Sequence, residues 1–327
     1  MKQVEERYIS LLTDFGFKRI FGSAPNKDLL ICFLNSLFNG RQVVKDVKYL
    51  NPENVGDIYT DRKAIFDVYC EGANGEKFIV EMQNAYQTYF KDRALFYSTF
   101  PIREQAPKGS EWDFKLNHVY TIALLNFNMN EDAFNKEEIR HHVQLCDTAT
   151  HKIFYDKLEF IYVEIAKFNK SLDELDTLYD KWLYALKNLY KLTQRPKALC
   201  DKVFDRLFEE AEIAKFTPQE QREYEASKMA YRDIKNSIDT AKREGKEEGL
   251  AEGREKGLAE GMEKGLAEGM KKGLAEGVEK GLAEGMEKGM NKRSLEIARK
   301  MLANGMDAAT VMEITGLSES QLQQLKG

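Results

Sequence analysis

Proline and cysteine are scarce in this sequence, and long apolar runs are absent from it. Six prolines in 327 residues exclude a collagen-like or Pro-rich chain. The four cysteines are scattered without a Cys-x-x-Cys pair, so we expect neither a disulfide framework nor a structural zinc site. No apolar run approaches the roughly 20 residues that cross a bilayer, and the charged first residues are unlike a signal peptide. The sequence therefore predicts a cytoplasmic protein with no membrane partner.

The chain also lacks an excess of basic residues. Its 49 Lys and Arg residues stand against 54 Asp and Glu residues, for a net charge of −5. A protein that held nucleic acid by bulk electrostatic attraction would be basic, so any contact with DNA must come from a local patch. Apolar residues make up 43% of the chain and aromatic residues 11%, which is enough for a packed core.

Hydrophobic periodicity divides the chain into four segments. Residues 1–169 have a mixed α/β pattern, 170–240 form a helical extension, 241–292 a glycine repeat and 293–327 a small helical unit. In the first segment we expect helices over residues 8–21, 26–38 and 85–105. We expect strands over residues 43–49, 64–71, 76–84, 118–127, 142–147 and 159–166.

The repeat places glycine at every fourth position from Gly245 to Gly289. Its Glu-to-Lys pairs at i,i+4 stabilise a helix by about 2 kcal/mol in all, whereas twelve glycines cost on the order of 10 kcal/mol relative to alanine. The helix is therefore marginal unless partners pack on it. Three uses remain open: a tolerated spacer, an assembly helix that joins copies of the chain, or direct DNA contact, which the balanced charges of the tract disfavour.

The last 35 residues predict three short helices around Gly305 and Gly316. A helix, a turn with glycine and a second helix can read DNA. The final helix carries a single basic residue, Lys326, so a structural or oligomerising use is favoured over DNA reading. Together with the repeat, this unit could join the chain into a homo-oligomer.

Residues 64–84 read as a β-hairpin whose register decides its chemistry. A two-residue turn at Asn74 and Gly75 would place Asp67 opposite Met82. A three-residue loop, with Gly75 in the left-handed conformation, would instead place Asp67 opposite Glu81. This second register gathers the apolar side chains on one face: Phe66, Val68, Cys70, Phe78, Val80 and Met82.

We therefore predict that Asp67, Glu81 and Gln83 converge on the other face of the hairpin. Two carboxylates opposite each other on adjacent strands repel, and a divalent cation removes that repulsion. Oxygen ligands of this kind suit Mg²⁺ or Mn²⁺. The alternative is that Glu81 and Gln83 lie on a solvated face.

Four segments of the chain carry a family resemblance, in this order: residues 11–22, 61–68, 78–83 and 93–105. They resemble the recombination-promoting nuclease and transposase family of the PD-(D/E)XK nuclease superfamily, over roughly residues 1–235. The Gly-Glu-rich repeat and the short C-terminal helical unit are also similar to that family. The resemblance implies a restriction-endonuclease-like mixed sheet flanked by helices, which cuts DNA with Mg²⁺ or Mn²⁺.

The resemblance also implies roles for individual residues. Asp67 and Glu81 occupy the positions of the two metal-binding carboxylates, and Gln83 stands where the superfamily more often has lysine. Gln83 would position a water, Asp14 is a candidate for an additional acid, and Lys18 and Arg93 are candidates for phosphate contacts. The competing hypothesis is a nuclease-like core that binds DNA or assembles without cutting.

Overall fold

The computed structural model describes residues 6–51, 53–54, 64–106, 112–129, 131 and 133–325. It contains two compact units, Met1–Lys242 and Arg243–Gly327. Residues 61–63, which belong to the second family-like segment, lie outside the described residues.

The first unit is built on a six-stranded mixed sheet with the order β1-β4-β5-β6-β8-β7. The central pairs β5–β6 and β6–β8 are parallel, and the remaining pairs are antiparallel. The strands are β1 (Val47–Tyr49), β4 (Val68–Gly72), β5 (Lys77–Gln83), β6 (Val119–Leu125), β7 (Arg140–Cys146) and β8 (Ile153–Glu164). A separate two-stranded ladder joins β2 (Glu53–Asn54) to β3 (Ala64–Ile65).

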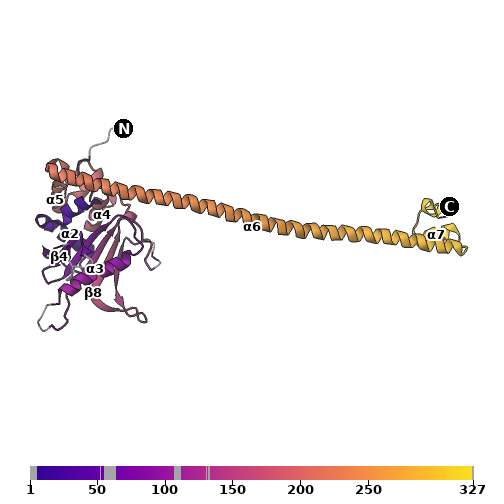
Figure 1. Ribbon diagram of the computed structural model, residues 1–327, viewed down its shortest axis with the longest axis horizontal. Coiled ribbons are helices and arrows are strands. Elements are labelled where there is room, and N and C mark those ends of the chain that lie inside the picture. Colours follow the sequence, from indigo (N-terminus) through magenta and orange to yellow (C-terminus); the bar gives the residue numbers. More distant parts are fainter. Residues whose placement is uncertain are drawn as a thin grey trace. The chain divides into compact units, whose positions relative to one another are not determined.

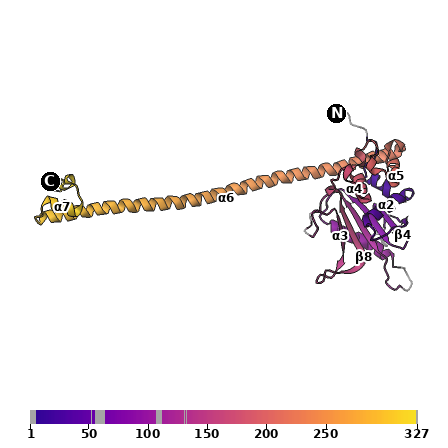
Figure 2. The ribbon, with the colours of Figure 1, turned by 180° about the vertical axis from the view of Figure 1, so that it is seen from behind.

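Helices cover both faces of this sheet (Figure 1). The helix α3 (Phe90–Glu104) connects the parallel strands β5 and β6 and packs on one face, where Phe100 contacts the cluster around Ile79. The other face is covered by α1 (Asp14–Phe21), α2 (Lys27–Phe38), α4 (Leu178–Asn188) and α5 (Lys202–Glu210). Figure 2 shows α2, α4 and α5 from behind, beside the start of α6 (Pro218–Ala303).

The main core joins the sheet to the helical extension. Phe33 of α2 packs within 5.9 Å, ring to ring, of the fully buried Trp182 on α4, and Trp182 in turn contacts Phe204 on α5. Tyr224 of α6 is fully buried in the same cluster. Residues 170–240 therefore share a core with the sheet, and the structure divides the chain at Lys242. The finer division into four segments stays a prediction.

The structure confirms the fold class and corrects several predicted boundaries. The helix predicted over residues 8–21 begins at Asp14, because Thr13 caps it and the preceding residues pair with residues 211–213 instead. The helix predicted over 85–105 begins at Phe90. The strand predicted over 64–71 is interrupted, since Phe66 and Asp67 lie between β3 and β4.

The second unit contains the end of α6, α7 (Ala308–Thr315) and α8 (Glu319–Gln323). Four buried side chains form its own small core: Ala298, Val311, Leu317 and Leu322. The side chain of Asp307 caps α7, and Gly316 ends it in the left-handed conformation with φ of 68°.

The glycine repeat is part of α6. At each repeat glycine, no heavy atom beyond the local helix backbone lies within 4 Å of the position that a Cβ would take, within the part of the chain that is described. The apolar residues of the repeat are exposed, from 56% at Leu258 to 72% at Met290. No partner for these glycines and apolar residues is therefore found among the described residues, and their use in assembly stays a prediction.

Candidate active site

The hairpin of β4 and β5 has the three-residue register. Val68 pairs with Val80, and this register places Asp67, which directly precedes β4, opposite Glu81. The loop of residues 73–75 ends at Gly75, whose φ is 85° and where an added Cβ would come within 2.7 Å of the side chain of Asn117. Glycine is thus required by both conformation and space. The predicted register is correct.

Asp67 leaves the ladder and binds the neighbouring strand through its side chain. Its Oδ2 accepts a hydrogen bond from the backbone N–H of Met82, at 2.9 Å. In a continued antiparallel ladder that N–H would donate to the carbonyl of Phe66. Phe66 consequently turns to the opposite face from the one predicted and packs against Tyr69 and Ile79. Burial raises the pKa of the Asp67 carboxyl, and the Met82 N–H and the charge of Lys18 offset this only in part.

Glu81 lies on β5, and its side chain is almost wholly buried. Its Oε2 accepts a hydrogen bond from the amide of Gln83 at 3.0 Å. Its Oε1 is buried and has no hydrogen-bond partner among the described residues. Burial, together with the neighbouring charge of Asp67, raises the pKa of Glu81 to about 8. A buried carboxylate oxygen without a partner is costly, so this position favours either a proton or a bound cation.

The helix α1 brings Asp14 and Lys18 to the same place. The Nζ of Lys18 lies 2.7 Å from Oδ1 of Asp14 and 3.8 Å from Oδ1 of Asp67. Burial acts to lower the pKa of Lys18, but its bond to Asp14 and the charges of Asp14, Asp67 and Glu81 outweigh it, so the pKa is raised. Asp14 itself is exposed, and among the described residues it forms no hydrogen bond or ion pair with the hairpin.

Arg93 approaches from α3. Its Nη2 lies 3.9 Å from Oε2 of Glu81, and its Nη1 donates to the side chain of Gln87 at 2.7 Å. Its guanidinium lies 5.6 Å from the ring centre of Phe90 and 5.7 Å from that of Tyr97. These contacts hold the cation beside Glu81.

The structure thus brings together all the residues that the sequence proposed for the site: Asp14, Lys18, Asp67, Glu81, Gln83 and Arg93. Sequence reasoning missed Gln87 and Tyr97, which hold Arg93. It also missed Ser227, whose Oγ accepts the backbone N–H of Phe15 at 3.0 Å and fixes the start of α1. Ser227 is 212 residues away in sequence, so no local pattern could have indicated this contact.

The donor atoms of the site fit a hard divalent cation. Two carboxylates, those of Asp67 and Glu81, are the acidic groups that the site offers. The described residues contain no group of three or more His, Cys, Asp and Glu side chains that could hold a metal. Magnesium is commonly bound by one or two carboxylates and keeps several waters. Such a cation would give the buried Oε1 of Glu81 a partner and would offset the repulsion between Glu81 and Asp67.

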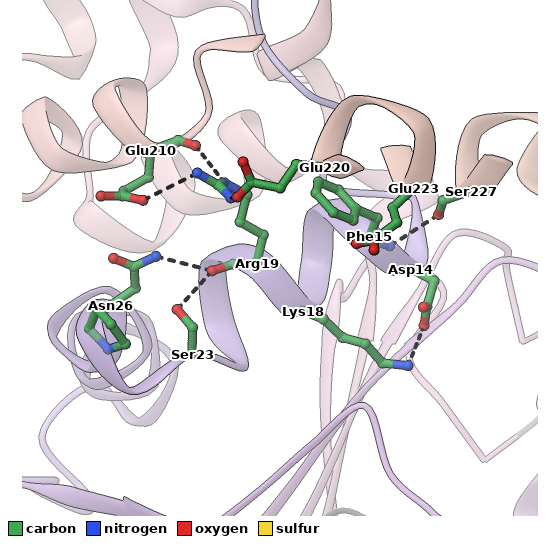
Figure 3. A pocket seen from close by; sticks show the side chains of 11 residues that line it. Asp14, Phe15, Lys18, Arg19, Ser23, Asn26, Glu210, Glu220, Glu223 and Ser227 are labelled. Carbon is green, nitrogen blue, oxygen red and sulfur yellow. Dashed lines mark hydrogen bonds and ion pairs between the residues drawn. The ribbon is translucent and has the colours of Figure 1, made fainter. Parts of the chain in front are cut away.

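A cavity of about 670 Å³ lies next to this site, between α1, α5 and α6. Asp14 and Lys18 line it, and Figure 3 shows their side chains on one side of α1, with Arg19 on another. Arg19 bonds the backbone carbonyl of Glu210 at 3.0 Å and forms an ion pair with Glu220. The cavity wall therefore includes the contacts that anchor α1.

The six-stranded mixed sheet flanked by helices is consistent with a restriction-endonuclease-like fold. The comparison with protein families agrees, since the model of the PD-(D/E)XK nuclease family transposases matches residues 11–241. The chain belongs to this family. No curated protein and no solved structure matches the chain.

A second family model matches residues 291–327, as the C-terminal HTH domain of the Rpn/YhgA-like nuclease family. This match favours the helix-turn-helix interpretation, which the sequence had ranked below a structural use. The end of α6, α7 and α8 supply the helices of this domain. None of the described helices is long and apolar enough for a membrane span.

Proposed function

We propose that the protein is a divalent-metal-dependent DNA endonuclease. The observation that carries this proposal is the buried, unpartnered Oε1 of Glu81 beside Asp67, in a chain of a nuclease family. The helix-turn-helix match at the other end of the chain supports DNA as the substrate. The matched family's description suggests transposition as the biological setting, and recombination is the alternative that the sequence resemblance implies.

Each residue of the site would have a separate role. Asp67 and Glu81 would hold Mg²⁺ or Mn²⁺, which when bound supplies positive charge to the scissile phosphate and lowers the pKa of a water. The amide of Gln83 fixes one oxygen of Glu81, and the other oxygen is buried without a hydrogen-bond partner among the described residues. Arg93 places a positive charge beside Glu81, with its Nη2 buried 3.9 Å from Oε2 of that carboxylate.

The reaction that these residues would serve is phosphodiester hydrolysis. A water oxygen forms a bond to phosphorus, and the bond from phosphorus to one ester oxygen breaks. The proton that the water loses passes to solvent, and the leaving oxygen takes one from solvent. Negative charge grows on the phosphoryl oxygens during this step, so cations held at the site stabilise it.

A second candidate function is DNA binding without cleavage. Gln83 favours it, because an amide does not carry the positive charge of the lysine more common at this position in the superfamily. Self-association through the repeat and the C-terminal unit is compatible with either function and also remains a proposal.

The test compares the wild type with Asp67→Asn and Glu81→Gln. Each is assayed for nicking of plasmid DNA and for the shift in melting temperature on addition of Mn²⁺, since a ligand that binds only the folded state raises that temperature. We expect the wild type to cut and to shift, and both variants to do neither. Glu71→Gln is the matched control, because Glu71 lies on the same hairpin in an ion pair with Lys77. A wild type that binds DNA but neither cuts nor shifts with Mn²⁺ would favour the second candidate.

A further inference from the structure

We propose that Lys18 of α1 supplies the ammonium group that Gln83 cannot supply from β5, and that it contacts the phosphate being cut. This inference rests on the proposed nuclease function and assigns the positive charge at its site. Gln83 ends β5 with an uncharged amide that is already bonded to Glu81. Lys18 reaches Asp67, the first carboxylate of the site, from a different element.

The position of Lys18 fits this role. Its Nζ is 3.8 Å from Oδ1 of Asp67, on the carboxylate oxygen that the Met82 N–H does not occupy. Its side chain is 41% exposed, so a phosphate can approach the ammonium from the solvent side. Arg93, the other cation of the site, is less exposed and is held between Gln87 and two aromatic rings.

Lys18 is not needed to hold α1 in place. Arg19, Phe15 and Ser10 already bind the neighbouring α5 and α6: Arg19 through Glu210 and Glu220, Phe15 through Ser227, and Ser10 through Tyr224. Figure 3 shows Arg19 directed to this anchoring side and Lys18 directed away from it. The remaining bond of Lys18, to Asp14 in an i,i+4 pair, is an exposed contact that adds little to stability.

The anchored helix gives the ammonium a defined position before DNA arrives. A charge that is already oriented stabilises developing negative charge at little reorganisation cost, and removal of one such group typically costs about 100-fold to 1,000-fold in rate. The chain therefore compensates for Gln83 with a cation 65 residues earlier in the sequence, in the segment that precedes the hairpin.

The experiment uses the full chain and the variants Lys18→Met, Lys27→Met and Lys18→Met combined with Gln83→Lys. Lys27 is the matched control, because it also pairs with a carboxylate, Asp46, at 2.7 Å on the surface. DNA cleavage is measured at saturating DNA, and Mn²⁺ binding is measured separately from the midpoint of the melting-temperature shift. The second measurement does not depend on activity.

We expect Lys18→Met to cut about 100-fold more slowly or less while it binds Mn²⁺ at least as tightly as the wild type, because a competing positive charge near Asp67 has been removed. Lys27→Met should remain within about twofold, and Gln83→Lys should restore part of the lost rate, as it returns an ammonium to the same carboxylates.

Two results would overturn the role of Lys18 and leave the nuclease function standing. In the first, Lys18→Met cuts DNA within a few-fold of the wild type. In the second, Lys18→Met loses the Mn²⁺ shift and is not rescued by Gln83→Lys. A wild type that neither cuts DNA nor responds to Mn²⁺ would instead reject the nuclease function, and this proposal with it.

Discussion

The carboxylate of Asp67 accepts the backbone N–H of Met82 at 2.9 Å, and this bond ties the loop before β4 to the strand that carries Glu81. Oδ2 of Asp67 therefore stabilises the hairpin, while Oδ1 lies 3.8 Å from Nζ of Lys18. Under the proposed function, the stability of the hairpin and the chemistry of the site both depend on the side chain of Asp67.

This double role of Asp67 predicts that two substitutions lower the free energy of unfolding by different amounts. Asp67→Asn keeps an oxygen that can accept the Met82 N–H, so the free energy of unfolding should change by less than about 1 kcal/mol. Asp67→Ala leaves that N–H without its acceptor and should cost about 1–3 kcal/mol. Denaturant unfolding without metal measures both, and equal losses would show that the hydrogen bond does not stabilise the hairpin.

The pKa of Glu81 predicts how the metal-free protein responds to pH. In the unfolded chain this carboxyl titrates near 4.5, whereas in the folded protein burial and Asp67 raise its pKa to about 8. The folded state holds the proton more tightly, so this contribution to stability is complete below pH 4.5 and is lost as the pH rises through 8. The loss is on the order of a few kcal/mol.

Glu81→Gln removes this titration. In chelator, the wild type should lose unfolding free energy between pH 5 and pH 8, and the variant should lose less over the same interval. Identical pH profiles for the two proteins would contradict the raised pKa.

Gln83→Lys tests the position where the chain differs from the commoner residue of its superfamily. A lysine there still donates to Oε2 of Glu81, where the amide now lies at 3.0 Å, and it adds a positive charge. We expect DNA cleavage to be retained and the Mn²⁺ concentration at half-saturation to rise, because the new charge opposes cation binding. Loss of all cleavage in a folded variant would show that the amide itself is required.

Deletion of residues 249–289 tests the glycine repeat. Among the described residues, nothing outside the local helix backbone lies within 4 Å of a Cβ built at its glycines, and the deleted residues carry nine acidic and seven basic side chains, so they do not attract phosphate. DNA cleavage should therefore stay within a few-fold of the wild type. If copies of the chain associate through the exposed leucines and methionines, the mass measured by light scattering should fall. Abolished cleavage would mean that the repeat contributes to the site.

The isolated C-terminal unit, residues 291–327, should be helical. It has its own small core around Val311 and Leu317, but about 40 residues rarely fold robustly without a partner. We therefore expect a helical circular dichroism signal that grows with peptide concentration. A random-coil spectrum at every concentration would contradict an autonomous unit.

Much of the site could be predicted because it depends on local patterns. The alternation of apolar residues selected the register that places Asp67 beside Glu81, and the ladder confirms it. The orientation of Phe66 was predicted wrongly, because the Asp67 side chain captures the Met82 N–H and bends the strand. A hydrogen bond in which a side chain replaces a backbone acceptor cannot be predicted from the periodicity of apolar residues.

The wrong start of the first helix has a different cause. Tyr8, Ile9, Leu11 and Leu12 are all buried, so their spacing satisfies a helical pattern although they are not helical. Their backbone instead pairs with a segment about 200 residues later, where Ile9 donates to the carbonyl of Ala211. Contacts of such long sequence separation cannot be read from a local window.

The contacts of the first turns of α6 determine where recombination between related genes could replace the C-terminal tail. The hydroxyls of Tyr224 and Ser227 accept backbone N–H groups next to and within the helix that carries Asp14 and Lys18, so these turns of α6 belong to the nuclease. A genetic crossover after residue 242 would replace the tail and leave α1 anchored. A crossover before residue 224 would separate α1 from its supports. Related genes that acquire new tails are therefore expected to keep the first turns of this helix together with the nuclease-family domain.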